Sequence, residues 1–190
     1  MAVLQRVMSE AEYLAWEAEQ EERNEFYDGE IVAMAGGSIV HNTIVQNISV
    51  AVDNAFGEGS SCCAFTHAQK VRAEQGRSYL YPDVVVACGE LREGEGNAVL
   101  NPLVVFEILS PSTESRDRRV KRELYQSIPS LQEYVLVSQE QALVEVYRRQ
   151  ESGVWEESVV VGLGAALRLE SLDVSLPLER IYRRVEFSED

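Results

Sequence analysis

The sequence predicts a mixed α/β (α+β) fold in which helices flank a β-sheet. Two short apolar runs, at 84–88 and 100–109, are rich in β-branched residues and bounded by Gly, Pro and Asn, which is typical of strands buried on both faces. Between Ser38 and Gly57, apolar residues recur every four positions, as in a helix that packs on a core. Helical and strand patterns follow one another irregularly, which favours a mixed sheet over a regular βαβ array.

Local signals place three elements before the buried strands. Ser9 and Glu12 match a capping box, which predicts a first helix from Ser9 to about residue 21. The Asp28-Gly29 pair between two β-prone runs is the strongest hairpin signal in the chain. Ser38 is placed to cap the second helix.

The rest of the chain continues the mixed pattern. We expect strands at 62–74, 79–88, 99–109, 135–137, 143–147 and 155–161, an irregular or strand-like segment at 167–176, and helices at about 114–127 and 177–182. Pro129 closes the first of these two helices, and Pro177 opens the second.

Size and charge limit the possible classes of function. With 190 residues, 45% of them hydrophobic, the chain is expected to form a single domain over 1–190. No apolar run approaches the roughly 20 residues that span a bilayer, and the N-terminus lacks the apolar core of a signal peptide, so we expect a cytoplasmic protein without membrane contact. The net charge of −15 argues against broad attraction to nucleic acid. The basic run at 116–122 is the exception, either as a phosphate-facing patch or as a solvated helix face.

The cysteines and histidines offer no zinc site. Cys62, Cys63 and Cys88 are odd in number and form no CxxC pair, and adjacent cysteines rarely bridge, so reduced thiols are predicted. His41 and His67 are the chain's two histidines. Any metal would therefore be held by oxygen, which means magnesium, manganese or calcium.

The candidate site combines acids from two strands with the helix that follows them. Asp83 stands at the mouth of the 84–88 run, and Glu107 interrupts the second run. A buried carboxylate needs a hydrogen bond, a cation or a metal to compensate for lost hydration. Asp117, Lys121 and Tyr125 are spaced i, i+4, i+8, so one helix face can present an acid, an amine and a phenol to the strand ends.

These groups suggest phosphodiester chemistry if the two strands are neighbours. Asp83 and Glu107 could then hold a divalent cation, with Glu25 of the hairpin as a further acid, while Lys121 orients water or stabilises developing negative charge. Lysine is a notable choice, because the chain has two lysines against fifteen arginines.

Structural alternatives exist for most of these residues. Asp83 could cap a turn, Asp117 and Lys121 could form an ordinary helical ion pair, Glu25 could be an exposed strand residue, and His41 could be a histidine beside a core helix. Glu107 is the hardest to explain structurally, because it is flanked by large apolar residues. Lys70 and Gln69, on the strand before Asp83, are weaker candidates for the site.

At these residues the chain resembles the Uma-two type family of bacterial restriction endonucleases, a branch of the PD-(D/E)XK nuclease superfamily. The resemblance covers about 8–182. Its motifs are ERNEFYDGEIVAM, His41, Pro82-Asp83-Val84-Val85-Val86, VFEILSPST, Asp117 with Lys121 and Tyr125, and Glu133-Tyr134.

The resemblance implies a restriction-endonuclease-like fold and an Mg²⁺- or Mn²⁺-dependent deoxyribonuclease that acts on DNA as a homodimer. Asp83 and Glu107 would be the metal-binding acids, Glu25 the extra acid, and Lys121 a catalytic residue. The superfamily places a lysine two residues after the glutamate, where this chain has Leu109. Lys121 would substitute for it. The departure, with the negative charge, leaves open a non-catalytic nuclease-fold module that binds nucleic acid or a protein partner.

Overall fold

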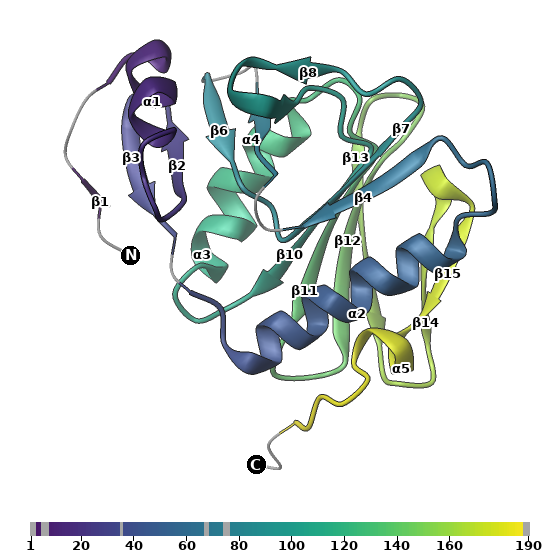
Figure 1. Cartoon of the computed structure of the whole chain (residues 1–190). Helices are drawn as coiled ribbons and strands as arrows, with labels where there is room; N and C mark the ends of the chain where they lie inside the picture. Colours follow the sequence, from purple (N-terminus) through teal and green to yellow (C-terminus); the bar gives the residue numbers. More distant parts are fainter. Residues whose placement is uncertain (1–2, 5–7, 35, 67–68, 74–76, 188–190) are drawn as a thin grey trace.

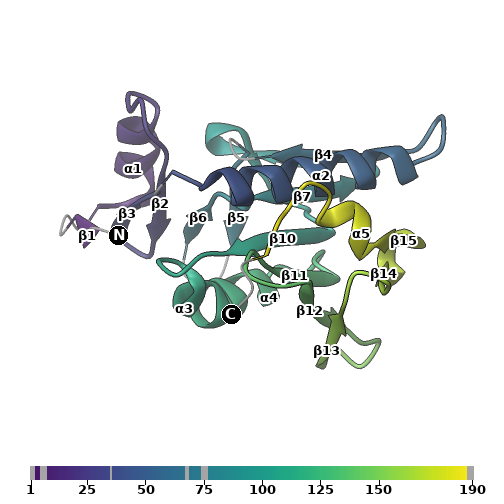
Figure 2. The same ribbon diagram turned by 90° about the horizontal axis from the view of Figure 1, so that it is seen from below.

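The computed structural model describes residues 3–4, 8–34, 36–66, 69–73 and 77–187. Within these residues the strands form sheets of seven, six and two strands. The six-stranded one, here the central sheet, has the order β13-β12-β11-β10-β7-β4, and helices cover both of its faces (Figures 1 and 2). In the described part of the chain, no helix has the length and apolar character needed to cross a membrane.

The helical elements are α1 (Glu10–Glu17), α2 (Ile39–Ala55), η1 (Glu95–Asn97), α3 (Glu114–Arg116), η2 (Asp117–Lys121), α4 (Arg122–Gln126), η3 (Glu170–Leu172) and α5 (Leu178–Ile181). The strands are β1 (Val3–Leu4), β2 (Asn24–Tyr27), β3 (Glu30–Ala33), β4 (Cys62–Thr66), β5 (Val71–Ala73), β6 (Ser78–Leu80), β7 (Val84–Cys88), β8 (Glu93–Gly94), β9 (Ala98–Val99), β10 (Val104–Leu109), β11 (Glu133–Ser138), β12 (Leu143–Arg149), β13 (Trp155–Val161), β14 (Ala166–Leu169) and β15 (Val174–Pro177).

Strand β10 is the interior strand around which the central sheet is built. It pairs parallel with β11 and antiparallel with β7, and all six of its residues are buried. One sheet face packs on α2 through Ile44 and Ile48, and the other packs on α4 through Tyr125. The β-branched composition of the run at 104–109 therefore reflects burial on both faces, as predicted.

The seven-stranded sheet, here the N-terminal sheet, has the order β1-β3-β2-β6-β5-β9-β8. Its β2–β3 hairpin turns at Asp28 and Gly29, whose φ values of 45° and 104° lie in the left-handed region that this dipeptide tolerates. Helix α1 packs on this sheet through Tyr13, which stacks on Phe26. This sheet brings β2 beside the end of the central sheet.

Several local predictions are confirmed. Ser9 and Glu12 form the reciprocal capping box at α1, and the Ser38 side chain accepts a hydrogen bond from the His41 amide at the start of α2. The first helix ends at Glu17, four residues before the expected end. The predicted helix at 114–127 is present as α3, η2 and α4, and its middle turn is π-helical.

Two predicted strands are each divided between the sheets. The segment 79–88 forms β6 in the N-terminal sheet and β7 in the central sheet, because Pro82 has no N–H to continue a ladder. The segment 62–74 likewise forms β4 and β5; residues 67, 68 and 74 lie outside the described residues. Only long-range pairing reveals these divisions.

The prediction of reduced cysteines is wrong for Cys62 and Cys88, which form a disulfide. They are direct partners in the antiparallel β4–β7 ladder, a register that the sequence does not reveal. Cys63, the neighbour of Cys62, is an exposed free thiol. The rule that adjacent cysteines rarely bridge each other held, but it did not exclude a bridge between strands.

Candidate active site

The carboxylate of Asp83 lies where β7 begins. The β7–β10 ladder pairs Val84 with Phe106, and continuing this register by one residue sets Asp83 opposite Glu107. Opposed residues of an antiparallel pair point to the same sheet face with their Cβ atoms about 5 Å apart. Both carboxylates line one cavity, as the candidate site requires.

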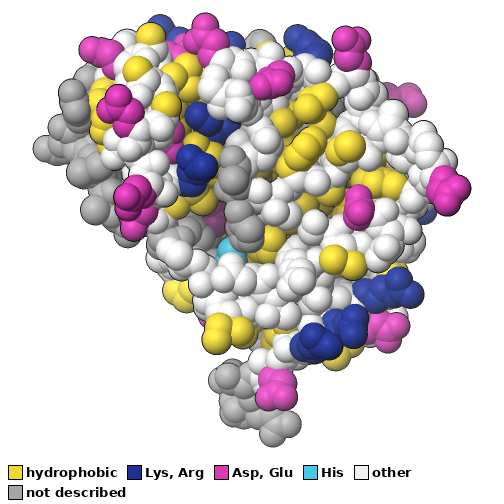
Figure 3. All heavy atoms as spheres, in the orientation of Figure 1, with side chains coloured by type: hydrophobic (Ala, Val, Ile, Leu, Met, Phe, Trp, Pro, Cys, Tyr) yellow, Lys and Arg dark blue, Asp and Glu magenta, His cyan; other side chains and the backbone are white. Residues whose placement is uncertain are grey.

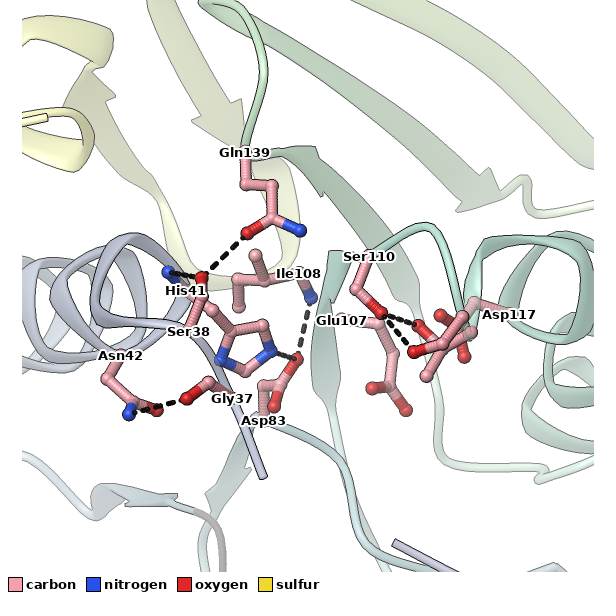
Figure 4. A network of polar contacts seen from close by, with 12 residues as sticks. Gly37, Ser38, His41, Asn42, Asp83, Glu107, Ile108, Ser110, Asp117 and Gln139 are labelled. Carbon is pink, nitrogen blue, oxygen red and sulfur yellow. Dashed lines mark hydrogen bonds and ion pairs between the residues drawn. The ribbon is translucent and has the colours of Figure 1, made fainter. Parts of the chain in front are cut away.

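Asp83 is fixed in place by two donors at one oxygen. Its Oδ2 accepts a hydrogen bond from the Ile108 amide at 2.7 Å and lies 3.2 Å from His41 Nε2. Figure 4 shows the His41 ring and the Ile108 amide converging on Asp83. In this view Glu107 and Asp117 lie on the side of Asp83 opposite His41. The Asp83 contacts raise the pKa of His41 above its usual value although burial opposes the charged ring, so the pair holds a proton more firmly than a free histidine.

Glu107 is 4% exposed and projects from the middle of β10. Its Oε1 accepts hydrogen bonds from Lys121 Nζ at 3.0 Å and from the Tyr125 hydroxyl at 2.9 Å. Burial raises its pKa well above the usual value, and Asp117, Asp83 and Glu25 raise it further, against the opposing effect of Lys121. Glu107 is thus a carboxylate for which the surrounding positive charge is insufficient.

Lys121 lies at the end of the π-helical turn η2, and its ammonium is surrounded by acids. Nζ is 2.9 Å from Glu25 Oε1, 3.0 Å from Glu107 Oε1 and 3.6 Å from Asp117 Oδ1. Burial disfavours its charged form, but Glu107 and Glu25 outweigh that effect and raise its pKa well above the usual value. Lys121 therefore remains protonated and cannot serve as a general base.

Glu25 is buried at 3% exposure, so it is not the exposed strand residue that was one alternative. Besides contacting Lys121, Oε1 accepts the Tyr81 amide at 3.1 Å, and Oε2 accepts the Tyr27 hydroxyl at 2.5 Å. These contacts engage both oxygens. They make Glu25 the residue that anchors Lys121 from the N-terminal sheet.

The sequence pointed to Asp117 and Tyr125, and the structure places both beside Glu107. Asp117 is 1% exposed, and its pKa is raised by burial against the opposing effects of Lys121 and Thr113. Tyr27 was missed as a member of this cluster. Its signal was available, since it lies two residues after Glu25 and so shares a strand face with it.

The predicted catalytic residues Glu25, Asp83, Glu107 and Lys121 line one cavity of about 270 Å³ between the start of α2, the end of β10 and η2. Among its described lining residues are four acids, one lysine and one histidine: Glu25, Asp83, Glu107, Asp117, Lys121 and His41. Leu109 instead joins the apolar cluster with Tyr125 and Leu136. The ammonium expected two residues after Glu107 is therefore supplied by η2. Lys70 lies elsewhere, over the Tyr13 and Tyr81 rings.

The carboxylate oxygens of this cavity suit a hard divalent cation as ligands. In the described part of the chain, the hydrogen bonds of Asp83 and Glu107 use one oxygen each, and Oδ1 of Asp117 is buried without a hydrogen-bond partner. Within the described residues, no group of three His, Cys, Asp or Glu side chains could hold a metal ion unaided. Magnesium and manganese are commonly held by one or two carboxylates, with water and substrate phosphate completing the shell. Asp83 and Glu107 fit that pattern.

The mixed sheet flanked by helices, with buried acids and an ammonium gathered at the strand ends, has the restriction-endonuclease-like fold that the sequence predicts. Residues 10–179 match the Uma2 family, described as "Putative restriction endonuclease". The chain belongs to this family.

Similar proteins match nearly the whole length of the chain. The chain is 35% identical over 182 residues to the uncharacterized protein slr1290 of Synechocystis sp., covering 95% of this chain and 94% of that one. It is 31% identical over 171 residues to sll1609 of the same organism, covering 89% and 96%. A crystal structure from Anabaena variabilis, described as a "putative nuclease belonging to DUF820", shares the fold with a TM-score of 0.75 at 18% identity, covering 92% and 97%.

Proposed function

We propose that this protein is a metal-dependent endonuclease that hydrolyses phosphodiester bonds of DNA. The observation that carries the proposal is the charge of the cavity, where one ammonium faces four carboxylates among the described lining residues. Uncompensated buried charge is costly, and a divalent cation would offset it. Membership of a nuclease family supports the same reaction class.

Asp83 and Glu107 would hold magnesium or manganese. When bound, the ion would polarise a phosphoryl oxygen and lower the pKa of an attacking water. The Ile108 amide and His41 keep the Asp83 carboxylate oriented, and the Tyr125 hydroxyl does the same for Glu107. Preorganised ligands of this kind need no rearrangement when substrate arrives.

Lys121 would act as a fixed positive charge. Its raised pKa keeps it protonated, so it can donate hydrogen bonds to a water or to a phosphate oxygen that gains negative charge. Glu25 and Asp117 hold the ammonium beside Glu107. In this proposal Glu25 anchors Lys121; its predicted role as a metal ligand stays a prediction, and its contacts favour the anchoring role.

The test is cleavage of plasmid DNA by purified protein with Mn²⁺, using Asp83→Ala and Lys121→Ala. Asp53→Asn is the matched control, because Asp53 is an exposed acid of α2 that does not line the cavity. Wild type and the control should cut and both site variants should not, with circular dichroism verifying their folding. Cutting that persists in both site variants would refute the proposal.

We further propose that one domain spanning the chain acts as a homodimer on duplex DNA, since two strands need two hydrolytic events. Sedimentation velocity with and without duplex tests this directly. A species that stays monomeric in both conditions contradicts it.

A further inference from the structure

A second cavity, here the arginine groove, lies on the outer side of α2 beside α5. It encloses about 510 Å³, more than the acidic cavity. Arg180, Arg183 and Arg184 line it together with amide side chains of α2, among them Asn47 and Asn54. Among the described residues that line it there is no acid. Figure 3 shows side chains of the basic colour gathered over α5 on this face.

The backbone that carries the arginines is anchored. Asn47 Nδ2 donates to the carbonyl oxygens of Ile181 at 2.9 Å and Arg183 at 2.8 Å, which ties the segment after α5 to α2. Leu178 and Ile181 are fully buried in the core beneath it. The groove therefore presents its guanidinium groups from a fixed frame.

The distinguishing feature of these arginines is that three of them, without ion pairs in the described part of the chain, lie together. Arg118, Arg148 and Arg168 form ion pairs with acids, whereas Arg180, Arg183 and Arg184 form none among the described residues. The chain has 32 acids against 17 basic residues, so partners are plentiful. Three arginines left together without one are available to an external anion.

Helix α2 connects this groove to the acidic cavity. Ser38 and Asn42 line the acidic cavity, and the groove begins at Thr43 and extends to Asn54. At a rise of about 1.5 Å per residue, Asn47 lies roughly 7.5 Å and Asn54 roughly 18 Å along the axis from Asn42. Along the axis of duplex DNA the phosphates of one strand follow one another every 3.4 Å or so, so a duplex lying along α2 would span about two to five nucleotides over this length.

We propose that the arginine groove binds the phosphate backbone of the DNA that enters the acidic cavity, about two to five nucleotides from the bond to be cut. This inference rests on the proposed function. Guanidinium forks match phosphate oxygens, and the amides of α2 add neutral hydrogen bonds. Contacts of this kind position nucleic acid without reading its sequence.

The test measures binding of a fluorescent DNA duplex in EDTA over a series of salt concentrations. The variant replaces Arg180, Arg183 and Arg184 by alanine. The matched control replaces Arg23, Arg77 and Arg92, which are exposed and immediately precede β2, β6 and β8. These three strands lie away from α5 in Figure 1. Each lost phosphate contact removes about 0.9 from the slope of log K against log salt, so the groove variant should lose about 2.7 and bind roughly tenfold or more weakly.

Equal binding by the groove variant and the control, or no binding by wild type, would overturn the inference. Hydrolysis of bis(p-nitrophenyl) phosphate, which is too small to span both cavities, should be unchanged in the groove variant. If the wild-type protein cuts no DNA but the groove variant binds duplex more weakly than wild type, the proposed function is wrong and the inference about the groove stands. If the wild-type protein cuts DNA but the groove variant binds duplex as tightly as wild type, the proposed function stands and the inference about the groove is wrong.

Discussion

Replacing Lys121 by methionine removes the charge at the centre of the acidic cluster while keeping most of the side-chain volume. The ammonium it deletes lies 2.9 Å from Glu25 and 3.0 Å from Glu107. At an effective dielectric constant of about 20, each contact corresponds to roughly 5–6 kcal/mol of Coulomb attraction. Desolvation of the buried ions offsets much of this, and breaking such a cluster typically costs about 3–5 kcal/mol.

The assay is denaturant and thermal unfolding in metal-free buffer, both followed by circular dichroism. For a chain of this length the expected loss corresponds to a melting temperature lower by roughly 6–20 °C. Lys70→Met is the matched control, since Lys70 is the chain's other lysine and contacts two tyrosine rings without an ion pair among described residues. It should cost about 1 kcal/mol or less.

The pH dependence gives a second check on Lys121→Met. Without the ammonium, burial holds the pKa values of Glu107 and Asp117 above those of the unfolded chain. The variant should therefore regain stability as pH falls toward the ordinary pKa of a carboxyl group. Adding Glu107→Gln should also recover part of the loss. Three results would refute this account of the cluster: a stability loss under about 1 kcal/mol for Lys121→Met, a loss that does not change with pH, or strict additivity of the effects of Lys121→Met and Glu107→Gln.

Two further predictions follow from burial and pairing. The pKa of Glu107 is raised in the folded protein, so its ionisation opposes folding above the pKa of the unfolded group. The melting temperature of Glu107→Gln minus that of metal-free wild type should therefore rise with pH. A difference that stays flat or falls contradicts the raised pKa of Glu107. Replacing Cys62 and Cys88 by serine opens a loop closed by a bridge across 26 positions and should cost about 3.5 kcal/mol in non-reducing buffer, while Cys63→Ser should be neutral; an equal effect of both changes argues against the bridge.

Signals confined to neighbouring residues were sufficient for much of the fold. The capping box at Ser9, the turn at Asp28 and the apolar run around Glu107 each depend on contacts within a few positions, and each is found in the structure. A carboxylate inside an apolar strand also pointed to the acidic cavity that Glu107 lines, because burial of that charge requires compensation wherever the strand lies.

The parts that were missed depend on distant pairing. Nothing near Cys62 shows that its ladder partner is Cys88, and nothing in the run 79–88 shows that its halves join different sheets. From the sequence, Glu25 could equally be an exposed strand residue or a member of the site, because its partner Lys121 lies 96 positions away. These features are set by tertiary register, which local periodicity does not encode.

The central claim is that the acidic cavity is short of positive charge and takes up a divalent cation through Asp83 and Glu107. Calorimetric titration of metal-free protein with Mn²⁺ tests it without requiring activity. Wild type and Asp53→Asn should bind, with affinity that weakens as pH falls because the proton on Glu107 competes with the ion. Asp83→Asn and Glu107→Gln should bind roughly tenfold or more weakly. No heat above dilution for wild type, or equal binding by all four proteins, would contradict the claim.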